Sequence, residues 1–374
     1  MLDILQAKIG LVVILIAVLI LPFKVRAIER NLEIFLFVSG VLALTFSGFI
    51  PIPAEQTGWS WKILTEALTT PLNIINIQGI PIGIVQIVLI VGIIIYIWYR
   101  QIELAIYSLA KKFSVSMIVF GLIIILGLIS SVISAILASI LLVEIICALP
   151  LERGSKIDIT VVACFAIGLG AALTPLGEPL STIVISKLSG APYHADFGFL
   201  IRILGIYIIP AVIVLGIIGV FLYKRGSAVT GVPECHLQRE TIRQVVVRAG
   251  KVYLFIMALV FLGEGFKPIV VDYVTLIPAE GLYWVNMISA VLDNATLAAA
   301  EIGPTLSVHQ LKSALMGLLI AGGMLIPGNI PNIIAAGKLE ITSKEWARRG
   351  VPLGLVLMVC FFGILFIPQY LGLA

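Results

Sequence analysis

The chain is dominated by apolar segments that meet or approach the length needed to cross a lipid bilayer as helices. They occupy residues 9–22, 33–50, 79–98, 197–222, 252–271 and 351–368. A helix needs roughly 20 apolar residues to span a hydrocarbon core of about 30 Å. Only 12% of the 374 residues are charged, about half the share in a soluble globular protein. The apolar runs lack the alternating pattern of a transmembrane barrel. We therefore predict an all-α polytopic membrane protein.

Basic residues gather in some of the connections between these segments and are missing from others. Lys and Arg occur after the first apolar segment, around residues 100–112, throughout residues 224–251 and within residues 338–349. By contrast, residues 51–60 and 272–281 contain neither Lys nor Arg. Because basic loops stay in the cytoplasm, we expect the connections rich in Lys and Arg to be cytoplasmic.

Two stretches of the sequence recur in the same order. ISAILAS at Ile133–Ser139 is followed by ISAVLDN at Ile288–Asn294, and Thr174–Leu188 is followed by a similar stretch at Ile326–Leu339. Aligning the Lys-Leu pairs that end the second pair of stretches places Gly177 opposite Gly328, Glu178 opposite Asn329 and Ser181 opposite Asn332. Recurrence in order and at nearly equal separation indicates an internal repeat.

The topology predicts that each repeat contains a re-entrant hairpin. Residues 113–150 begin and end beside basic residues and are too few for two full spans with a loop. We expect their tip near Ser134–Ser139. Residues 277–306 begin and end on the side that lacks Lys and Arg, with a tip near Ser289–Thr296. The hairpins would thus enter from opposite sides, as in the inverted-topology repeats of secondary transporters.

Each hairpin is followed by a predicted transmembrane helix that is broken at its middle. Residues 157–188 contain Thr174-Pro175-Leu176-Gly177-Glu178-Pro179, and residues 310–339 contain Pro327-Gly328-Asn329-Ile330-Pro331-Asn332. Two prolines around a glycine remove helix hydrogen bonds and allow a local excursion. Freed backbone groups are tolerated in a membrane only where they are buried in protein or line a cavity.

The predicted division of the chain follows from these features. Residues 1–78 hold the N-terminal transmembrane helices and an extracellular connector, and residues 79–223 form the first repeat. Residues 224–250 are a cytoplasmic basic linker, and residues 251–374 form the second repeat.

Polar side chains concentrate at the hairpin tips and the breaks, where we predict an ion or substrate site. The predicted ligands are Glu178, Asp293, Asn294, Thr296, Asn329, Asn332, Thr174, Ser181, Thr182, Ser134, Ser139 and Ser289. A carboxylate at the centre of a membrane helix costs about 2.5 kcal/mol or more on insertion scales, so such groups face a cavity and act there. Glu178 and Asp293 are the strongest candidates.

The charge inventory favours a cation as the cargo. Neither Arg, Lys nor His occurs between residues 157 and 186 or between 281 and 308, and hard cations bind carboxylate, amide, hydroxyl and carbonyl oxygens. We expect Glu178, Asp293 and Asn294 to bind the transported metal ion. A carboxylate also binds a proton, and the possible proton carriers are Glu178, Asp293, Glu144 and Glu301. Na⁺ and H⁺ are thus the expected ions, and no cofactor is expected.

These motifs resemble those of the ion transporter superfamily, which includes NhaD-type sodium/proton antiporters, arsenite permeases and divalent anion:sodium symporters. Asp293-Asn294-Ala295-Thr296 is similar to the Asp-Asn-Ala-Pro/Thr tip of the first two branches. The two breaks are similar to the Gly-Thr-Pro-Pro-Asn break of the third branch, and the likeness covers roughly residues 79–370. The resemblance implies a homodimer in which hairpins and broken helices move against a scaffold in an elevator-like manner.

Two departures from the third branch weaken the case for a dicarboxylate substrate and favour a small branch that carries a cation. The first tip, Ala138-Ser139-Ile140, lacks the expected Asn, and Glu178 stands where Thr is expected. We predict a secondary transporter, most simply a sodium/proton antiporter, in the plasma membrane of a prokaryote. The alternative is a sodium-coupled symporter of a small carboxylate or oxyanion.

Other classes of function are disfavoured. The sequence contains no HExxH, GxSxG or paired Cys/His pattern that would indicate an enzyme, so we expect none. The four cysteines lack the spacing of a metal site. Membrane lipids and a small inorganic ion are the expected partners, and no nucleic acid is expected.

Overall fold

The protein is described by a computed structural model, which places most of the chain. The described residues are 3–25, 27–28, 31–52, 57–72, 75–77, 80–83, 85–86, 89–90, 92–94, 96–98, 101, 114–149, 151–225, 241–273, 276–290 and 294–372. The fold is helical apart from a short antiparallel hairpin, β1 (Ile75–Ile77) and β2 (Ile80–Ile82), in which Ile75 faces Ile82.

The helices of the N-terminal half follow the apolar segments of the sequence. They are α1 (Ile4–Lys24), α3 (Leu32–Ser47), α4 (Trp61–Thr69), α6 (Val115–Ile133), α7 (Ala135–Ala148), α8 (Arg153–Ala171), α9 (Pro179–Lys187) and α10 (Phe199–Arg225). The predicted apolar segment at residues 79–98 is described only in part. α1, α3 and α10 confirm the segments predicted around residues 9–22, 33–50 and 197–222.

The C-terminal half contains further helices, several of them short. They are α11 (Ile242–Tyr273), α12 (Ala279–Val285), the 3₁₀ helix η2 (Asn286–Ala290), α13 (Asn294–Glu301), α14 (Val308–Gly322), the 3₁₀ helix η3 (Ile326–Gly328), α15 (Ile330–Lys338) and α16 (Ser343–Tyr370). α11 begins inside the predicted linker of residues 224–250, of which residues 226–240 lie outside the described part.

Within the described part of the chain, five helices are long and apolar enough to cross a membrane. They are α6, α8, α10, α11 and α16. Large apolar side chains such as Ile206 and Val359 are more than half exposed on these helices, as expected for surfaces that face lipid rather than water. The chain is an all-α membrane protein.

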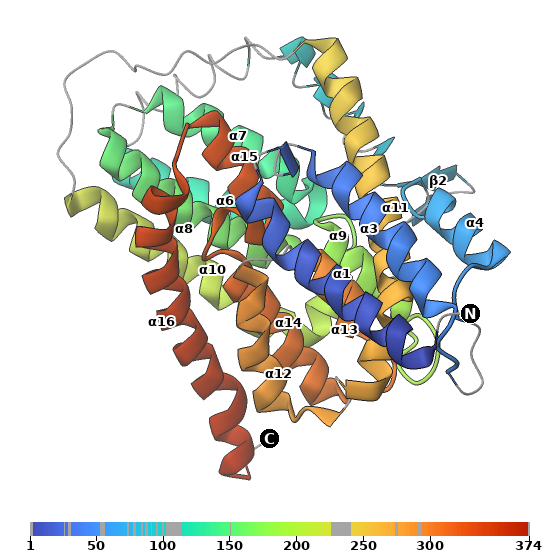
Figure 1. Cartoon of the computed structure of the whole chain (residues 1–374). Coiled ribbons are helices and arrows are strands. Elements are labelled where there is room, and N and C mark those ends of the chain that lie inside the picture. The colour runs from blue at the N-terminus through green and yellow to red at the C-terminus, as the bar shows by residue number, and fades with distance from the viewer. Residues whose placement is uncertain are drawn as a thin grey trace.

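The helices pack in two groups, which meet where Ala249 and Ile256 of α11 share a core with Ile136 and Ile140 of α7. α1, α3, α4 and α11 lie side by side and share two small apolar cores, one around Leu36 and Phe266 and one around Leu44 and Phe261. The larger core extends through α6–α10 and α12–α16. Figure 1 shows α1, α3 and α11 on one side of the molecule and α6, α8, α10 and α16 on the other. Leu297 of α13 packs against cores of both groups.

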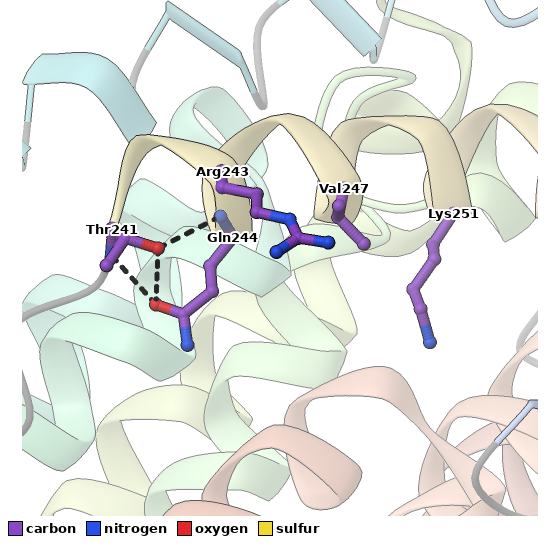
Figure 2. Close-up of a pocket in the computed structure, with 5 residues that line it drawn as sticks. All are labelled: Thr241, Arg243, Gln244, Val247 and Lys251. Carbon is purple, nitrogen blue, oxygen red and sulfur yellow. Dashed lines mark hydrogen bonds between the residues drawn. The ribbon is translucent and has the colours of Figure 1, made fainter.

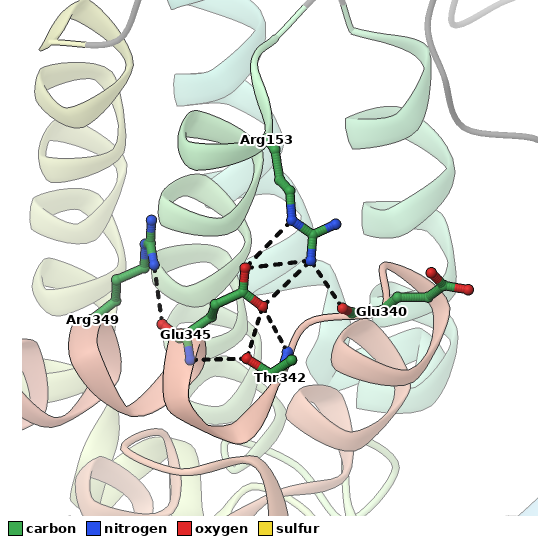
Figure 3. A network of polar contacts seen from close by, with 5 residues as sticks. All are labelled: Arg153, Glu340, Thr342, Glu345 and Arg349. Carbon is green, nitrogen blue, oxygen red and sulfur yellow. Dashed lines mark hydrogen bonds and ion pairs between the residues drawn. The ribbon is translucent and has the colours of Figure 1, made fainter.

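A polar network joins the first turns of α8 and α16 (Figure 3). The Arg153 guanidinium donates to the Glu340 carbonyl oxygen at 3.0 Å and lies 3.3 Å from Oε2 of Glu345. The same Glu345 carboxylate accepts from the backbone N–H of Thr342 at 2.9 Å and so completes the capping box of α16. Arg349 pairs with Asp158 one turn further along. The two halves of the larger group are therefore held together at this end.

Candidate functional site

The two breaks have the same backbone geometry. α8 ends at Ala171 and α9 begins at Pro179, while α14 ends at Gly322 and α15 begins at Ile330. The N-caps of α9 and α15 are Glu178 (φ −155°, ψ 160°) and Asn329 (φ −152°, ψ 146°), and neither side chain caps its own helix. Because α9 and α15 both span nine residues, the internal alignment of this stretch holds position by position.

Proline alone does not produce these breaks. Pro210 in α10 and Pro268 in α11 lie within continuous helices. At the breaks the chain turns back onto the helix end that precedes it. A Cβ atom on Gly177 would lie 2.0 Å from the carbonyl oxygen of Ala171, and one on Gly328 would lie 2.5 Å from that of Gly322. Only glycine fits such an approach, which explains why both breaks contain one at this position.

Each break contacts the hairpin that precedes it. In the first half, the backbone N–H of Ala135 donates to the Gly177 carbonyl oxygen at 2.7 Å, and the Thr174 hydroxyl donates to the Ser131 carbonyl oxygen. In the second half, a Cβ atom on Gly328 would lie 2.6 Å from the carbonyl oxygen of Ser289. In the described residues, each break therefore contacts a segment that we predicted as a hairpin tip.

The two halves also complete one another. α7 of the first hairpin packs against α15, and α13 of the second hairpin packs against α9. α15 crosses α8, where the Cys164 thiol lies 3.7 Å from the carbonyl oxygen of Pro331. The Asn329 amide nitrogen would lie 2.4 Å from a Cβ atom on Gly168, so this glycine leaves space for the Asn329 side chain. Tips and breaks of both halves thus form one region.

Buried side chains hold the breaks in shape. The Ser181 hydroxyl donates to the carbonyl oxygen of Ala171 at 3.4 Å, and the Asn332 amide donates to that of Gly322 at 2.8 Å. These two donors and two acceptors are equivalent in the alignment. The Thr182 hydroxyl donates to the Pro175 carbonyl oxygen at 2.7 Å. These bonds satisfy carbonyl groups that the interrupted helices leave free.

Three predicted ligands carry buried polar atoms without a hydrogen-bond partner among the described residues. They are Oγ of Ser134, Nδ2 of Asn294 and Oδ1 of Asn332. Each residue is at most 4% exposed. Glu178, whose carboxyl group lies at the first break, is 3% exposed. Since buried polar groups rarely lack a partner, unsatisfied atoms at both tips and at the second break indicate a place for a bound polar species.

The remaining predicted ligands differ in what the structure shows of them. Ser139 is buried in α7, where its hydroxyl donates to the Ala135 carbonyl oxygen at 2.6 Å. Ser289 donates to the Leu318 carbonyl oxygen at 3.1 Å. Asp293 and the side chain of Thr296 lie outside the described residues. Both serines contribute to packing at the tips, and their hydroxyl groups retain acceptor capacity.

The two further carboxylates named from the sequence have different surroundings. Glu144, on α7, lies 3.7 Å from the Lys338 ammonium at the end of α15, with its side chain 12% exposed. Glu301, at the end of α13, accepts a hydrogen bond of 2.7 Å from the Asn286 amide and is 6% exposed. Glu144 is therefore paired with a cation and Glu301 with an amide.

Sequence reasoning missed Ser130, Asn286 and Gly168. The Ser130 hydroxyl donates to the Ile167 carbonyl oxygen at 3.0 Å, as Ser289 does to Leu318 at the equivalent position of α14. By this contact Ser130 is the structural counterpart of Ser289. The sequence alignment had instead paired Ser289 with Ser134, which lies one helical turn after Ser130. The same shift aligns Asp293 with Ser134. Asn286 was detectable as an isolated amide within an apolar stretch.

A surface pocket elsewhere has a different character. Thr241, Arg243, Gln244, Val247 and Lys251 line a pocket of about 490 Å³ at the start of α11 (Figure 2). Lys251 also pairs with Glu33 at 2.8 Å. None of the predicted ligands lines this pocket. The described residues contain no group of three or more His, Cys, Asp or Glu side chains arranged to hold a metal ion.

A family model described as Protein of unknown function (DUF1646) matches residues 8–367. The chain belongs to the DUF1646 family. No curated protein matches the sequence. The range matched by DUF1646 includes both breaks and both hairpins, so the site described above lies within the DUF1646 region of the chain.

Substitutions at the first tip of this DUF1646 protein test its backbone geometry. Ser134 has φ 82° and ψ 149°, a conformation that costs a residue other than glycine about 1–3 kcal/mol. We expect Ser134→Gly to raise the thermal stability of the purified protein. Ser139→Gly, inside α7, is expected to lower the free energy of unfolding by about 0.5–1 kcal/mol. Equal losses in both variants would show that Ser134 is not strained.

Proposed function

We propose that this protein is a secondary active transporter of a small cation, with exchange of Na⁺ for H⁺ as its reaction. The observation that carries the proposal is the pair of equivalent helix breaks, which bury carboxyl, amide and hydroxyl groups together in a membrane protein. Broken helices at equivalent positions are the typical setting for substrate and ion sites in secondary transporters.

The composition of the site favours a cation over an anion. Glu178 supplies a carboxylate, Asn329 and Asn332 supply amides, and the stretches that form both breaks and the second hairpin tip contain no Lys, Arg or His until Lys187 and Lys338 at the helix ends. Oxygen ligands of this kind suit hard cations. In the sequence, Asp293 directly precedes Asn294 and is the second carboxylate of the proposed site.

The arrangement of the hairpins supports inverted repeats. The second hairpin has short arms, α12 with η2 and then α13, and helices of this length cannot cross a bilayer. In the first hairpin, α6 is long enough to cross and α7 is shorter. In Figure 1, α7 and α15 lie toward the top of the view and α12 and α13 toward the bottom. This placement agrees with two hairpins that enter from opposite sides.

The separation into two packed groups supports an elevator-like movement. α1, α3 and α4 share small cores with α11, whereas the hairpins and broken helices share the larger core. α11 also shares a core with α7 and α15 and packs against α13, so it lies at the boundary between the two groups. We propose that the first group is the scaffold, which would also form a homodimer, and that the second is the moving unit. The proposed setting is the plasma membrane of a prokaryote with the basic loops in the cytoplasm.

A sodium-coupled symporter of a small anion is the second candidate. The N-termini of α9 and α15, which lack a side-chain cap, favour it, because helix N-termini attract anions. However, Pro179 and Pro331 each remove an N–H group from these termini, and the Glu178 carboxylate would repel an anion. Uptake of a labelled carboxylate or oxyanion that requires Na⁺ would favour this candidate.

The test is a flux assay with the purified protein in liposomes that contain a pH-sensitive dye. An inward gradient of Na⁺, Li⁺ or K⁺ is applied in parallel, and we expect Na⁺ to drive proton efflux with K⁺ the least effective. Liposomes without protein and an imposed K⁺ diffusion potential control for leak and for uncoupled charge movement. Failure of every cation to move protons or to exchange with its own isotope would contradict the proposal.

A further inference from the structure

Glu301 differs from Glu144 and Glu264 because an amide holds it in place of a cation. Its Oε1 accepts from Nδ2 of Asn286 at 2.7 Å, and the same amide donates to the Ala314 carbonyl oxygen at 3.1 Å. Asn286 is 1% exposed, so α14 fixes the amide that orients the carboxyl group. Glu144 and Glu264, by contrast, pair with Lys338 and Lys267.

Several charged groups on the elements around α13 pair with groups other than Glu301. α9, α11, α14 and η2 pack against α13. The described groups on these helices and on α12 are Lys187, Arg243, Lys251, Tyr253, Glu264, Lys267, Asp272, Glu280, Tyr283, His309 and Lys312. Glu264 pairs with Lys267, Asp272 with Lys8, and Lys312 lies over the Tyr207 ring. Among the described residues, Asn286 is the group that bonds the Glu301 carboxyl.

Glu301 is connected to the tip by a short rigid element. α13 begins at Asn294, whose Nδ2 lacks a partner among the described residues, and ends at Glu301. Residues seven apart lie on the same face of a helix, and the rise per residue separates them by about 10 Å. The carboxyl group is thus near the tip, yet outside contact distance of an ion bound there.

We propose that Glu301 carries the proton in the exchange, at a site separate from the cation ligands of the breaks. The proposal rests on the proposed function and assigns one role within it. Burial of a carboxylate charge without a cation beside it is costly, so Glu301 is the neutral acid while the breaks are empty. When a cation binds at the breaks, the O–H bond of the Glu301 carboxylic acid breaks and the proton passes to water. The resulting Glu301 carboxylate offsets the positive charge of the bound cation. When the cation leaves, a proton from water restores the acid.

The first test uses the unmodified protein. Dicyclohexylcarbodiimide reacts with protonated carboxyl groups in apolar surroundings to give a stable N-acylurea, which peptide mass mapping locates. At neutral pH we expect labelling of Glu301, with less labelling at alkaline pH and in saturating Na⁺. Labelling of Glu178 with none at Glu301 would overturn the proposal, and so would labelling of Glu301 that is insensitive to both pH and Na⁺.

The second test measures proton release when Na⁺ is added to the purified protein in weakly buffered solution. Glu301→Gln is expected to lose this release and to bind Na⁺ about tenfold or more weakly, with less dependence on pH, because proton release and cation binding are coupled reciprocally. Glu340→Gln, on the exposed side chain beyond α15, is the matched control and keeps both. Unchanged proton release in Glu301→Gln would overturn the assignment. Absence of Na⁺ binding in the parent protein would instead refute the transport function itself.

Discussion

Replacement of Glu178 by Gln is expected to weaken binding of the transported cation by about 100-fold or more. Glutamine has nearly the same shape, so the N-cap position of α9 and the packing around it are retained. What is lost is the negative charge, and removal of one partner from a buried charge pair costs about 2–5 kcal/mol. The Na⁺ concentration that half-saturates exchange in liposomes measures the effect. Asn329→Asp, at the equivalent position of α15, adds a charge and is expected to strengthen binding.

Glu340→Gln is the control for this loss, because it removes the same charge from an exposed side chain after α15. It is expected to leave the half-saturating concentration unchanged. If Glu178→Gln and Glu340→Gln both behave like the parent, Glu178 is not a ligand. A protein that fails to fold is recognised beforehand by its thermal denaturation, since the glutamine variant should unfold within a few degrees of the parent.

Introduction of a methyl group at Gly170 is expected to cause the largest loss of stability. A Cβ atom there would lie 1.7 Å from the carbonyl oxygen of Gly127, at the contact between α6 and α8. The obstacle is backbone, so relief requires the two helices to separate. We expect Gly170→Ala to lower the free energy of unfolding by about 3 kcal/mol, near the upper end for overpacked sites. Thermal denaturation in detergent measures this change.

Gly250→Ala provides a matched comparison for Gly170→Ala. Gly250 also lies inside a helix, α11, but a Cβ atom there would have no neighbour within 4 Å. Alanine is preferred over glycine in helices by about 1 kcal/mol, so this variant should be slightly more stable than the parent. Similar losses in both variants would show that the contact between α6 and α8 is not tight.

The parts of the fold that depend on local sequence could be predicted. Long apolar runs identified α1, α3, α10, α11 and α16, because lipid requires a minimum length of apolar helix. A glycine at the equivalent position of each break, with prolines on either side, identified both breaks, and the alignment of Glu178 with Asn329 agrees with the backbone at both positions. These features depend on residues that are close together in the chain.

The contacts between the halves could not be predicted, because they join segments far apart in the sequence. Nothing in α7 indicates that it packs on α15 or that Glu144 meets Lys338. The hydrogen bonds of Ser130 and Ser289 favour a tip alignment one helical turn away from the one that identical letters suggested. α6 passes into α7 through Ser134 alone, whereas the first arm of the second hairpin ends in the 3₁₀ helix η2.

Helices of the first half pack against helices of the second half, and this affects how the protein is assembled. α9 packs against α13, and α7 packs against α15. The first half therefore lacks these neighbouring helices until most of the chain has been synthesised. Until then the polar groups of the first break are covered by lipid, water or the insertion machinery. Maturation in the membrane should therefore conclude with a late docking step, and a ribosome-bound chain ending before α13 should be markedly more sensitive to proteases.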